Sequence, residues 1–304
     1  MSHGGDGTNG HDGVRHGGDG TDGSGRVSHG LDGMDGGGSP SGGGPRRGGR
    51  IAGPSEADPA AFYAAGYGSR DPAEGERLGR WRALGARSKA AHVVALCARA
   101  GLRPGSVVEL GCGDGALLEA LSARGLGDAL DGFELSGPAA ALAAGRAIPR
   151  ARRVEAFDGA HVPAHDGAYD LAILSHVLEH VPEPLPLLAE AARIAGHVLV
   201  EVPLEANRSA ARPAKRAQAA TIGHVHAFDR AAVRALCAAA GLEVHDELAD
   251  PLSLPHHAFF AQTPRDHTAA AAKTALRRAA WRTAPRRAEG WFTVHYACLT
   301  VNAR

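Results

Sequence analysis

Apolar and polar positions alternate along the chain in blocks that predict strands and helices in turn. Short apolar runs that end at glycine or a polar residue predict strands, and apolar residues recurring every three or four positions predict helices. The expected strands are residues 106–110, 129–134, 152–157, 169–174, 197–202, 242–248 and 292–301. The expected helices are residues 74–99, 116–124, 138–147, 184–194 and 229–240.

This regular order of strand and helix is typical of a doubly wound α/β fold, a mostly parallel sheet with helices on both faces. Seven strands are expected in it. Two longer inserts, at about 204–228 and 249–290, interrupt the alternation, and the second contains a helical pattern over 269–281. We expect these inserts, with the helical material before the first strand, to cover a pocket.

The N-terminal segment has a different composition from the rest. Residues 1–50 contain 20 of the 42 glycines and almost no apolar residues. Such a segment cannot bury enough surface to offset the entropy lost on ordering. A disordered tail is therefore predicted over 1–57 and a folded domain over 58–304. The aromatic residues Phe62, Tyr63 and Tyr67 at the start of that domain either close over a bound cation or pack on the core.

Composition and charge exclude some classes of protein. The 33 basic residues balance 33 acidic ones, without the basic excess typical of nucleic-acid binding. No apolar run of roughly 18 residues and no leader peptide is visible, so no membrane partner is expected. The four cysteines form no CxxC pair, which is typical of reduced thiols and favours the cytoplasm.

The strongest local signal is a glycine-rich turn after the first sheet strand. The sequence VVELGCGDG over 107–115 places Gly111, Gly113 and Gly115 between a strand and a helix, where a ligand can approach the main chain and the first amides of the helix. Glu134 follows at the end of the second strand, placed to accept hydrogen bonds from a ribose. This combination also fits the loose dinucleotide fingerprint, so alone it indicates only an adenosine-containing cofactor.

Two acids narrow the choice of cofactor. Glu109 lies two residues before Gly111 in an otherwise apolar strand, where a carboxylate repels a diphosphate and attracts an ammonium or sulfonium group. Asp158 ends the third strand, placed to accept from an adenine amino group. The fourth strand is followed by the sequence SHVLEHVPEP, residues 175–184.

Together these segments resemble a class I S-adenosylmethionine-dependent methyltransferase of the small-molecule type that includes the ubiquinone-biosynthesis methyltransferases. The matching segments are 108–115, 132–136, 157–159, 169–184, 224–228 and 237–244. The resemblance implies a Rossmann-like methyltransferase fold whose seventh strand is antiparallel. It also implies a cofactor site: Gly111, Gly113 and Gly115 under the methionine portion, Glu109 and Asp114 near its amino group, Glu134 on the ribose and Asp158 by the adenine.

Three histidines are candidates for a base or an acceptor-orienting group. His176 follows the fourth strand, whose carboxyl end is where ligands bind in open α/β sheets. His224 and His226 lie in the first insert. Each could equally line the pocket or satisfy a main-chain carbonyl.

His176, Glu179 and His180 also spell the inverted zinc-peptidase motif. That motif needs a sustained helix, which Pro182 and Pro184 shorten to about two turns, so no metal is expected.

The predicted function is transfer of a methyl group from S-adenosylmethionine to a small-molecule acceptor by direct displacement. The enzyme alternative is an NAD(P)-dependent oxidoreductase, and the non-enzyme alternative is a cofactor-binding scaffold. Arginine-rich stretches at 208–216 and 277–287, and His256-His257, either contact an anionic acceptor or form solvated faces.

Overall fold

The computed structural model describes residues 49–50 and 72–303. The first of the chain's two compact units, Met1–Gly44, lies outside the described residues, and every described residue belongs to the second, Pro45–Arg304. The tail predicted over 1–57, apart from residues 49–50, and the aromatic residues Phe62, Tyr63 and Tyr67 lie outside the described residues as well.

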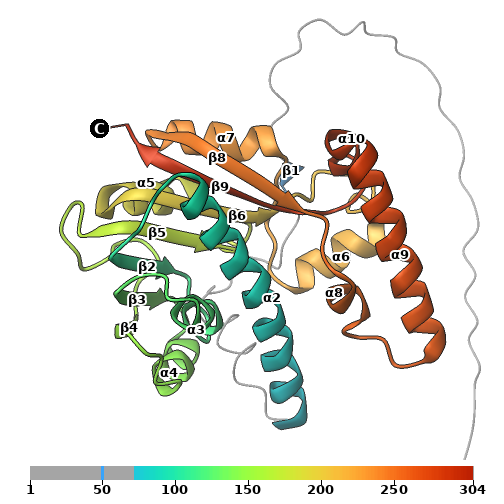
Figure 1. Ribbon diagram of the computed structural model, residues 1–304, viewed down its shortest axis with the longest axis horizontal. Helices are drawn as coiled ribbons and strands as arrows, with labels where there is room; N and C mark the ends of the chain where they lie inside the picture. The colour runs from blue at the N-terminus through green and yellow to red at the C-terminus, as the bar shows by residue number, and fades with distance from the viewer. Residues whose placement is uncertain (1–48, 51–71, 304) are drawn as a thin grey trace, which may run out of the picture. The chain divides into compact units, whose positions relative to one another are not determined.

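The centre of this unit is a seven-stranded sheet in the order β4-β3-β2-β5-β6-β9-β8 (Figure 1). Its strands are β2 (Ser106–Leu110), β3 (Ala129–Glu134), β4 (Ala151–Ala156), β5 (Tyr169–Ser175), β6 (Ala195–Pro203), β8 (Leu242–Asp250) and β9 (His295–Asn302). Neighbours from β4 to β6 are parallel, whereas β9 is antiparallel to both β6 and β8. The predicted fold class is therefore confirmed, including the antiparallel last strand.

Alternate residues of the central strands enter two separate cores. Val108 of β2 packs in the core that also holds Leu188 and Val233, while its neighbour Val107 packs with Leu96 and Leu118. The first core lies under α5 (Pro184–Ile194) and α7 (Arg230–Ala239). The second lies under α2 (Pro72–Arg99), α3 (Ala116–Ala123) and α4 (Gly137–Gly145). Helices thus cover both faces of the sheet, as the continuous apolar runs of its strands require.

The inserts contain more helix than the sequence pattern predicts. The first holds α6 (Pro213–Thr221) and β7 (His226–Ala227), which pairs with β1 (Gly49–Arg50). The second holds α8 (Leu254–Ala258), α9 (Pro264–Thr283) and α10 (Pro285–Glu289), where a single helix is expected over 269–281. A capping box fixes the start of α9: Thr263 Oγ1 accepts from the Asp266 amide, and Asp266 accepts from the Thr263 amide.

Helices α6, α8, α9 and α10 gather at one end of the sheet, and α8 lies beside α2 (Figure 1). Trp81 of α2 packs against Phe259 and Phe260 of the second insert, with ring centroids 5.1 and 5.2 Å away. Across residues 72–303, none of the helices combines the length and apolar character needed to cross a membrane.

Candidate active site

A cleft of about 1590 Å³ opens at the carboxyl ends of the central strands. The sheet contributes Glu109, Pro203 and His295, and the loop after β5 contributes His176. Helix α2 and both inserts supply the remaining walls. This is the end of an open α/β sheet at which ligands bind, and the strand crossovers on either side of β2 leave room for one there.

The glycine turn forms part of the floor of this cleft. Gly111, Gly113 and Gly115 all have left-handed backbones, with φ of 76°, 56° and 78°. A Cβ on Gly111 would lie 2.5 Å from Cγ2 of Val177, so any other residue there would be strained and overpacked. Gly111 and Gly113 line the cleft. Gly115 is outside its lining and instead allows close packing on Ala143 of α4, whose Cβ would be 3.0 Å from an added Cβ.

Glu109 is a buried carboxylate on the wall of the cleft, 3% exposed. Its Oε2 has no hydrogen-bond partner among the described residues. Burial raises the pKa of Glu109 well above its usual range; Lys89 acts against this, and Glu134 and Asp114 add to it. A positively charged group in the cleft would therefore stabilise the ionised form of Glu109.

Glu134 holds the glycine turn in shape. Its Oε2 accepts from the Gly113 amide at 2.8 Å and its Oε1 from the Ser136 amide at 2.9 Å. The carboxylate is buried and is not among the residues that line the cleft. Because each carboxylate oxygen has a second lone pair, both oxygens remain able to accept one more hydrogen bond.

Asp114 lines the cleft and is held by two arginines. Its Oδ2 is 2.7 Å from Arg82 Nε of α2 and 2.9 Å from Arg146 Nη2, at the end of α4. This carboxylate joins two helices to the turn. Asp158, by contrast, is exposed and lies outside the cleft lining; its Oδ1 accepts from the amides of Ala160 and His161, which lower its pKa.

His176 faces the cleft from a left-handed backbone, with φ of 58°. Non-glycine residues rarely adopt this conformation, and it concentrates at functional sites. The amide of His176 donates to the Glu201 carbonyl at 2.8 Å, and its Nδ1 lies 3.3 Å from Oε1 of buried Glu179. Its Nε2 has no partner among the described residues. Burial keeps the pKa of His176 well below 6.5, so the ring is neutral at pH 7.

The two histidines of the first insert differ from His176. His224 lines the cleft, but its Nδ1 lies 2.7 Å from Glu205 Oε2; burial lowers its pKa and the pairing more than reverses this. His226 is not among the cleft-lining residues, and its Nε2 lies 3.0 Å from the Val181 carbonyl oxygen. The structure therefore brings His176 and His224, but not His226, to the cleft.

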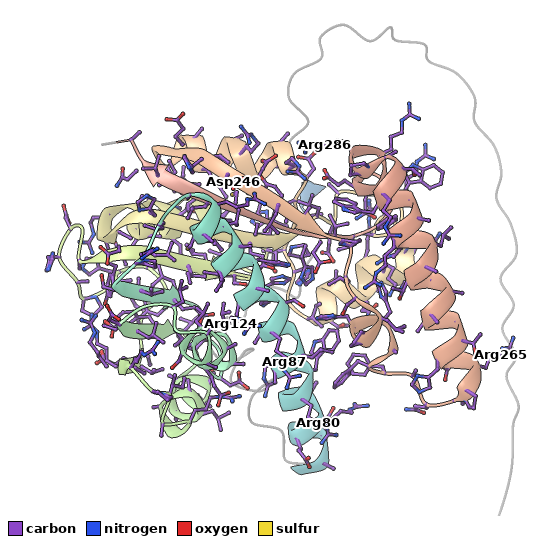
Figure 2. The ribbon with its side chains drawn as sticks, in the orientation of Figure 1. Arg80, Arg87, Arg124, Asp246, Arg265 and Arg286 are labelled. Carbon is purple, nitrogen blue, oxygen red and sulfur yellow. The ribbon has the colours of Figure 1, made fainter. Side chains whose placement is uncertain are left out.

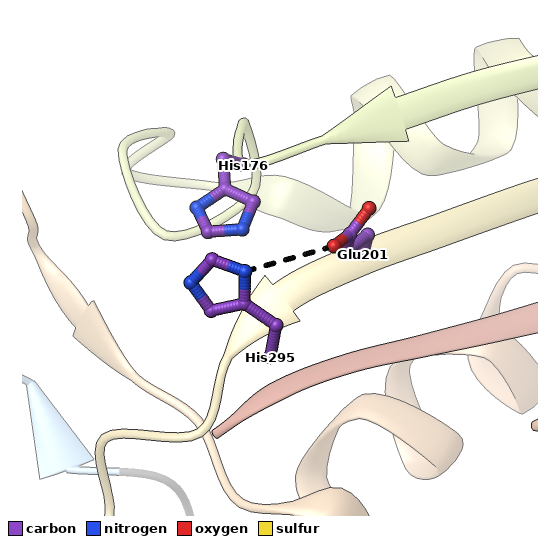
Figure 3. Close-up of side chains that lie close together, drawn as sticks. All are labelled: His176, Glu201 and His295. Carbon is purple, nitrogen blue, oxygen red and sulfur yellow. Dashed lines mark ion pairs between the residues drawn. The ribbon is translucent and has the colours of Figure 1, made fainter. Parts of the chain in front are cut away.

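The sequence analysis did not identify a charged network centred on Glu201, which is fully buried near the end of β6. His92 Nδ1 of α2 lies 3.0 Å from Glu201 Oε1, and Ser175 Oγ donates to its Oε2 at 3.1 Å. His295 Nδ1 of β9 is 3.8 Å from the same carboxylate and its ring meets that of His176 edge-on (Figure 3). A carboxylate inside the apolar run VLVEVP was the available signal.

Two groups of side chains among the described residues have ligand atoms within 4.8 Å of one another, close enough to hold a metal ion. They are His176, Glu201 and His295, and Glu179, His180 and His224. Residues 178–180 form a turn and not the short helix expected there, so the zinc-peptidase geometry of two ligands on one helix face is absent from this segment.

The strand order, the glycine turn after β2 and the acids around it define a class I S-adenosylmethionine-dependent methyltransferase. A sequence profile of the methyltransferase-domain family matches residues 81–247, more than half of the chain, and the chain belongs to that family. No curated protein sequence matches the chain.

Solved structures share this fold. A putative methyltransferase, in complex with the Haloferax volcanii Trm112 methyltransferase activator, is 18% identical with a TM-score of 0.53, over 80% of this chain and 98% of that one. A possible histamine N-methyltransferase from Thermotoga maritima is 16% identical with a TM-score of 0.52, over 81% and 100%. A putative sarcosine dimethylglycine methyltransferase from Galdieria sulphuraria is 17% identical with a TM-score of 0.50, over 72% and 86%.

Proposed function

We propose that this methyltransferase transfers the methyl group of S-adenosylmethionine to a small-molecule acceptor in the cleft by direct displacement. Bound there, the cofactor supplies a methyl group on a positively charged sulfur, and S-adenosylhomocysteine leaves when an acceptor atom attacks that carbon. The observation that carries this proposal is Glu109, a buried carboxylate with an unpartnered oxygen on the wall of the cleft.

The residues around the turn fit the cofactor. Glu109 stabilises its ammonium group, Gly111 and Gly113 let its methionine portion approach the main chain, and Asp114 stays near by while paired with Arg82 and Arg146. A diphosphate in the same place would oppose ionisation of Glu109, whereas an ammonium group favours it, and this difference disfavours the nicotinamide alternative.

The nucleoside end uses the acids at the ends of β3 and β4. Glu134 keeps a lone pair on each oxygen for the ribose hydroxyls while it holds the turn. At Asp158 the Oδ1 is engaged by two amides, which leaves Oδ2 for an adenine amino group. Gly115 contributes indirectly: it caps the start of α3, and its backbone there is left-handed.

For the transfer itself, the chain must hold the acceptor in line with the methyl group, a contribution of up to about 7–11 kcal/mol. His176 suits this role because its neutral ring lines the cleft and its buried Nε2 has no partner among the described residues. The same nitrogen can take a proton from an acceptor that must lose one to react. Pairing with Glu205 raises the pKa of His224 and favours its charged form, so His224 suits anchoring of an acceptor better than proton removal.

Calorimetric titration of the full chain with S-adenosylhomocysteine and, separately, with NAD⁺ tests the proposed cofactor site. We expect one binding site for S-adenosylhomocysteine and no heat from NAD⁺. Binding of NAD⁺ without S-adenosylhomocysteine contradicts the proposal.

The role of His176 is tested with S-adenosylmethionine labelled in its methyl group and fractionated extract from the source cells. We expect His176→Asn to keep its affinity for S-adenosylhomocysteine but to lose labelling of the acceptor by about 100-fold. Asn tolerates the left-handed backbone. The exposed His161 gives the control variant His161→Asn, which should label normally. Equal labelling by the wild type and His176→Asn contradicts the role.

A further inference from the structure

The wall of the cleft built by α6 and α9 is strongly positive. Five cations line the cleft from these two helices: Arg212, Lys215, Arg216, Lys273 and Arg277. Arg212 is the residue that caps the start of α6. We refer to these five as the cation wall. Neither helix contributes a carboxylate to the cleft lining.

The cation wall has no counter-charge in the described part of the chain. None of its five members forms an ion pair there, although Arg82, which also lines the cleft, is paired with Asp114. Lys215 Nζ donates to Gln218 Oε1, and Arg277 lies over the ring of Phe292 at 4.6 Å. These contacts position the side chains without neutralising them.

Cations from the two helices also act on one another. Burial lowers the pKa of Lys273, and the charges of Arg277 and Lys215 lower it further. Burial lowers the pKa of His257, and the charges of Lys273 and Arg277 lower it further, to about 4. Lys215 belongs to α6 and Lys273 to α9, so positive charge converges on the cleft from both inserts.

This arrangement is unfavourable in the absence of an anion. Lys273 and Arg277 are four residues apart on α9, and like charges at that spacing destabilise a helix. Elsewhere the chain uses the same spacing to attract, as in Glu76 and Arg80 of α2. Arg265, in the first turn of α9, projects outward from the molecule and is not among the cleft-lining residues (Figure 2). Arg277 of the cation wall is half-buried and the other four members are exposed, but all five line the cleft.

We infer that the methyl acceptor is a small molecule that carries a phosphate or diphosphate group, bound by the cation wall. Five cations exceed what a single carboxylate can neutralise, and guanidinium groups bind phosphate oxygens in bidentate fashion. This inference rests on the proposed function, because it assigns the cleft beside Glu109 and His176 to the acceptor.

Inorganic pyrophosphate, titrated calorimetrically into the full chain with S-adenosylhomocysteine present, tests the inference. We expect Lys273→Gln/Arg277→Gln to weaken pyrophosphate binding at least tenfold. The matched control is Arg265→Gln/Arg278→Gln, which removes two exposed cations of the same helix outside the cleft lining and should bind like the wild type. Lys215→Gln, at an exposed position of α6, gives a second test if the α9 double variant does not fold.

The outcomes separate the two proposals. The cation wall is overturned as an anion site if both double variants weaken pyrophosphate binding equally. It is also overturned if neither variant weakens that binding. Binding of citrate as tight as that of pyrophosphate overturns the choice of phosphate. If a short single-stranded oligonucleotide displaces pyrophosphate and binds more tightly than it, the inference of a small-molecule acceptor is overturned. If the proposed cofactor site is wrong, the wild type does not bind S-adenosylhomocysteine.

Discussion

Glu109 and Glu201 are both buried carboxylates in apolar strands, yet their surroundings drive them in opposite directions. Burial raises the pKa of each. At Glu109 the charge of Lys89 opposes burial without offsetting it, and the pKa ends well above its usual range. At Glu201 the hydrogen bond from His92 and the nearby His176 and His295 outweigh burial and lower the pKa to about 2. Glu201 has its cation, His92, within the protein, whereas we propose that Glu109 receives one from the bound cofactor.

Replacing Glu109 by Gln should therefore weaken S-adenosylhomocysteine binding about ten- to hundredfold, because a hydrogen bond to a charged group contributes roughly 1.5–3 kcal/mol. Cofactor binding should also release a proton from Glu109, since a nearby ammonium group favours the ionised carboxylate. Calorimetry in two buffers of different ionisation enthalpy measures both effects.

Glu119→Gln is the matched control, because Glu119 is exposed and pairs with Arg146 away from the cleft. It should bind like the wild type and release the same proton. Proton release that persists in Glu109→Gln, or affinity unchanged by that substitution, contradicts the role of Glu109.

Gly111→Ala should destabilise the protein by roughly 2–5 kcal/mol. A left-handed non-glycine residue costs about 1–2 kcal/mol, and overpacking against Val177 costs about 1–3 kcal/mol more. Urea unfolding measures the change. In the interior of α2, Gly79 has open space where a Cβ would be, so Gly79→Ala should stabilise the protein by about 0.5–1 kcal/mol. Equal effects of the two substitutions would show that the turn is not constrained as described.

The sequence predicted the residues of the turn because they are consecutive in the chain. It did not predict their partners. His92 and Glu201 are 109 residues apart, and no local pattern connects them. The same holds for Arg82 and Arg146, which contact Asp114 from helices on either side of it in sequence.

At the scale of secondary structure elements, one histidine joins α2 to two strands of the sheet. His92 Nδ1 lies 3.0 Å from Glu201 of β6, and its Nε2 lies 3.4 Å from Asp250 of β8. Burial lowers the pKa of His92, but these carboxylates more than offset it and raise the pKa to about 9. His176, His256 and His295 also face this cluster, and burial holds their pKa values down.

This pairing should make stability depend on pH. The folded pKa of His92 is above its unfolded value of 6.5, so its contribution is complete below about pH 6.5 and is lost as the pH rises through 9. Between pH 7 and pH 9.5 the wild type should lose about 2 kcal/mol more unfolding free energy than His92→Gln. Urea unfolding at the two pH values checks this.

An exposed histidine provides the control. His267→Gln, near the start of α9, should keep the full pH dependence of the wild type. A wild type and a His92→Gln variant that lose the same unfolding free energy between pH 7 and pH 9.5 would exclude His92 as the source.

Elements with a strong apolar pattern were predicted well. Strands β2 and β3 and helix α5 match their predicted bounds, because each has a buried face and ends at a clear signal such as glycine or proline. Helices α6, α8 and α10 were not predicted. Helix α6 has the sequence PAKRAQAAT, with a single buried residue, Ala219, and so has no apolar period for the sequence analysis to detect.

At the scale of the whole molecule, we propose that the sheet binds the cofactor and that the added segments form the acceptor pocket. Glu109 and the glycine turn come from the sheet end that binds ligands in this architecture. Helix α2 and both inserts close the cleft around it. The convergence of the inserts on one cleft depends on contacts between distant segments, such as Trp81 with Phe260, which the sequence analysis did not predict.

A crystal structure of the full chain grown with S-adenosylhomocysteine tests the central claim most directly. The account predicts the amino acid portion against Gly111 and Gly113, with the ammonium nitrogen within hydrogen-bond distance of the Glu109 carboxylate. Electron density for the ligand elsewhere, or for a diphosphate at the glycine turn, would contradict it.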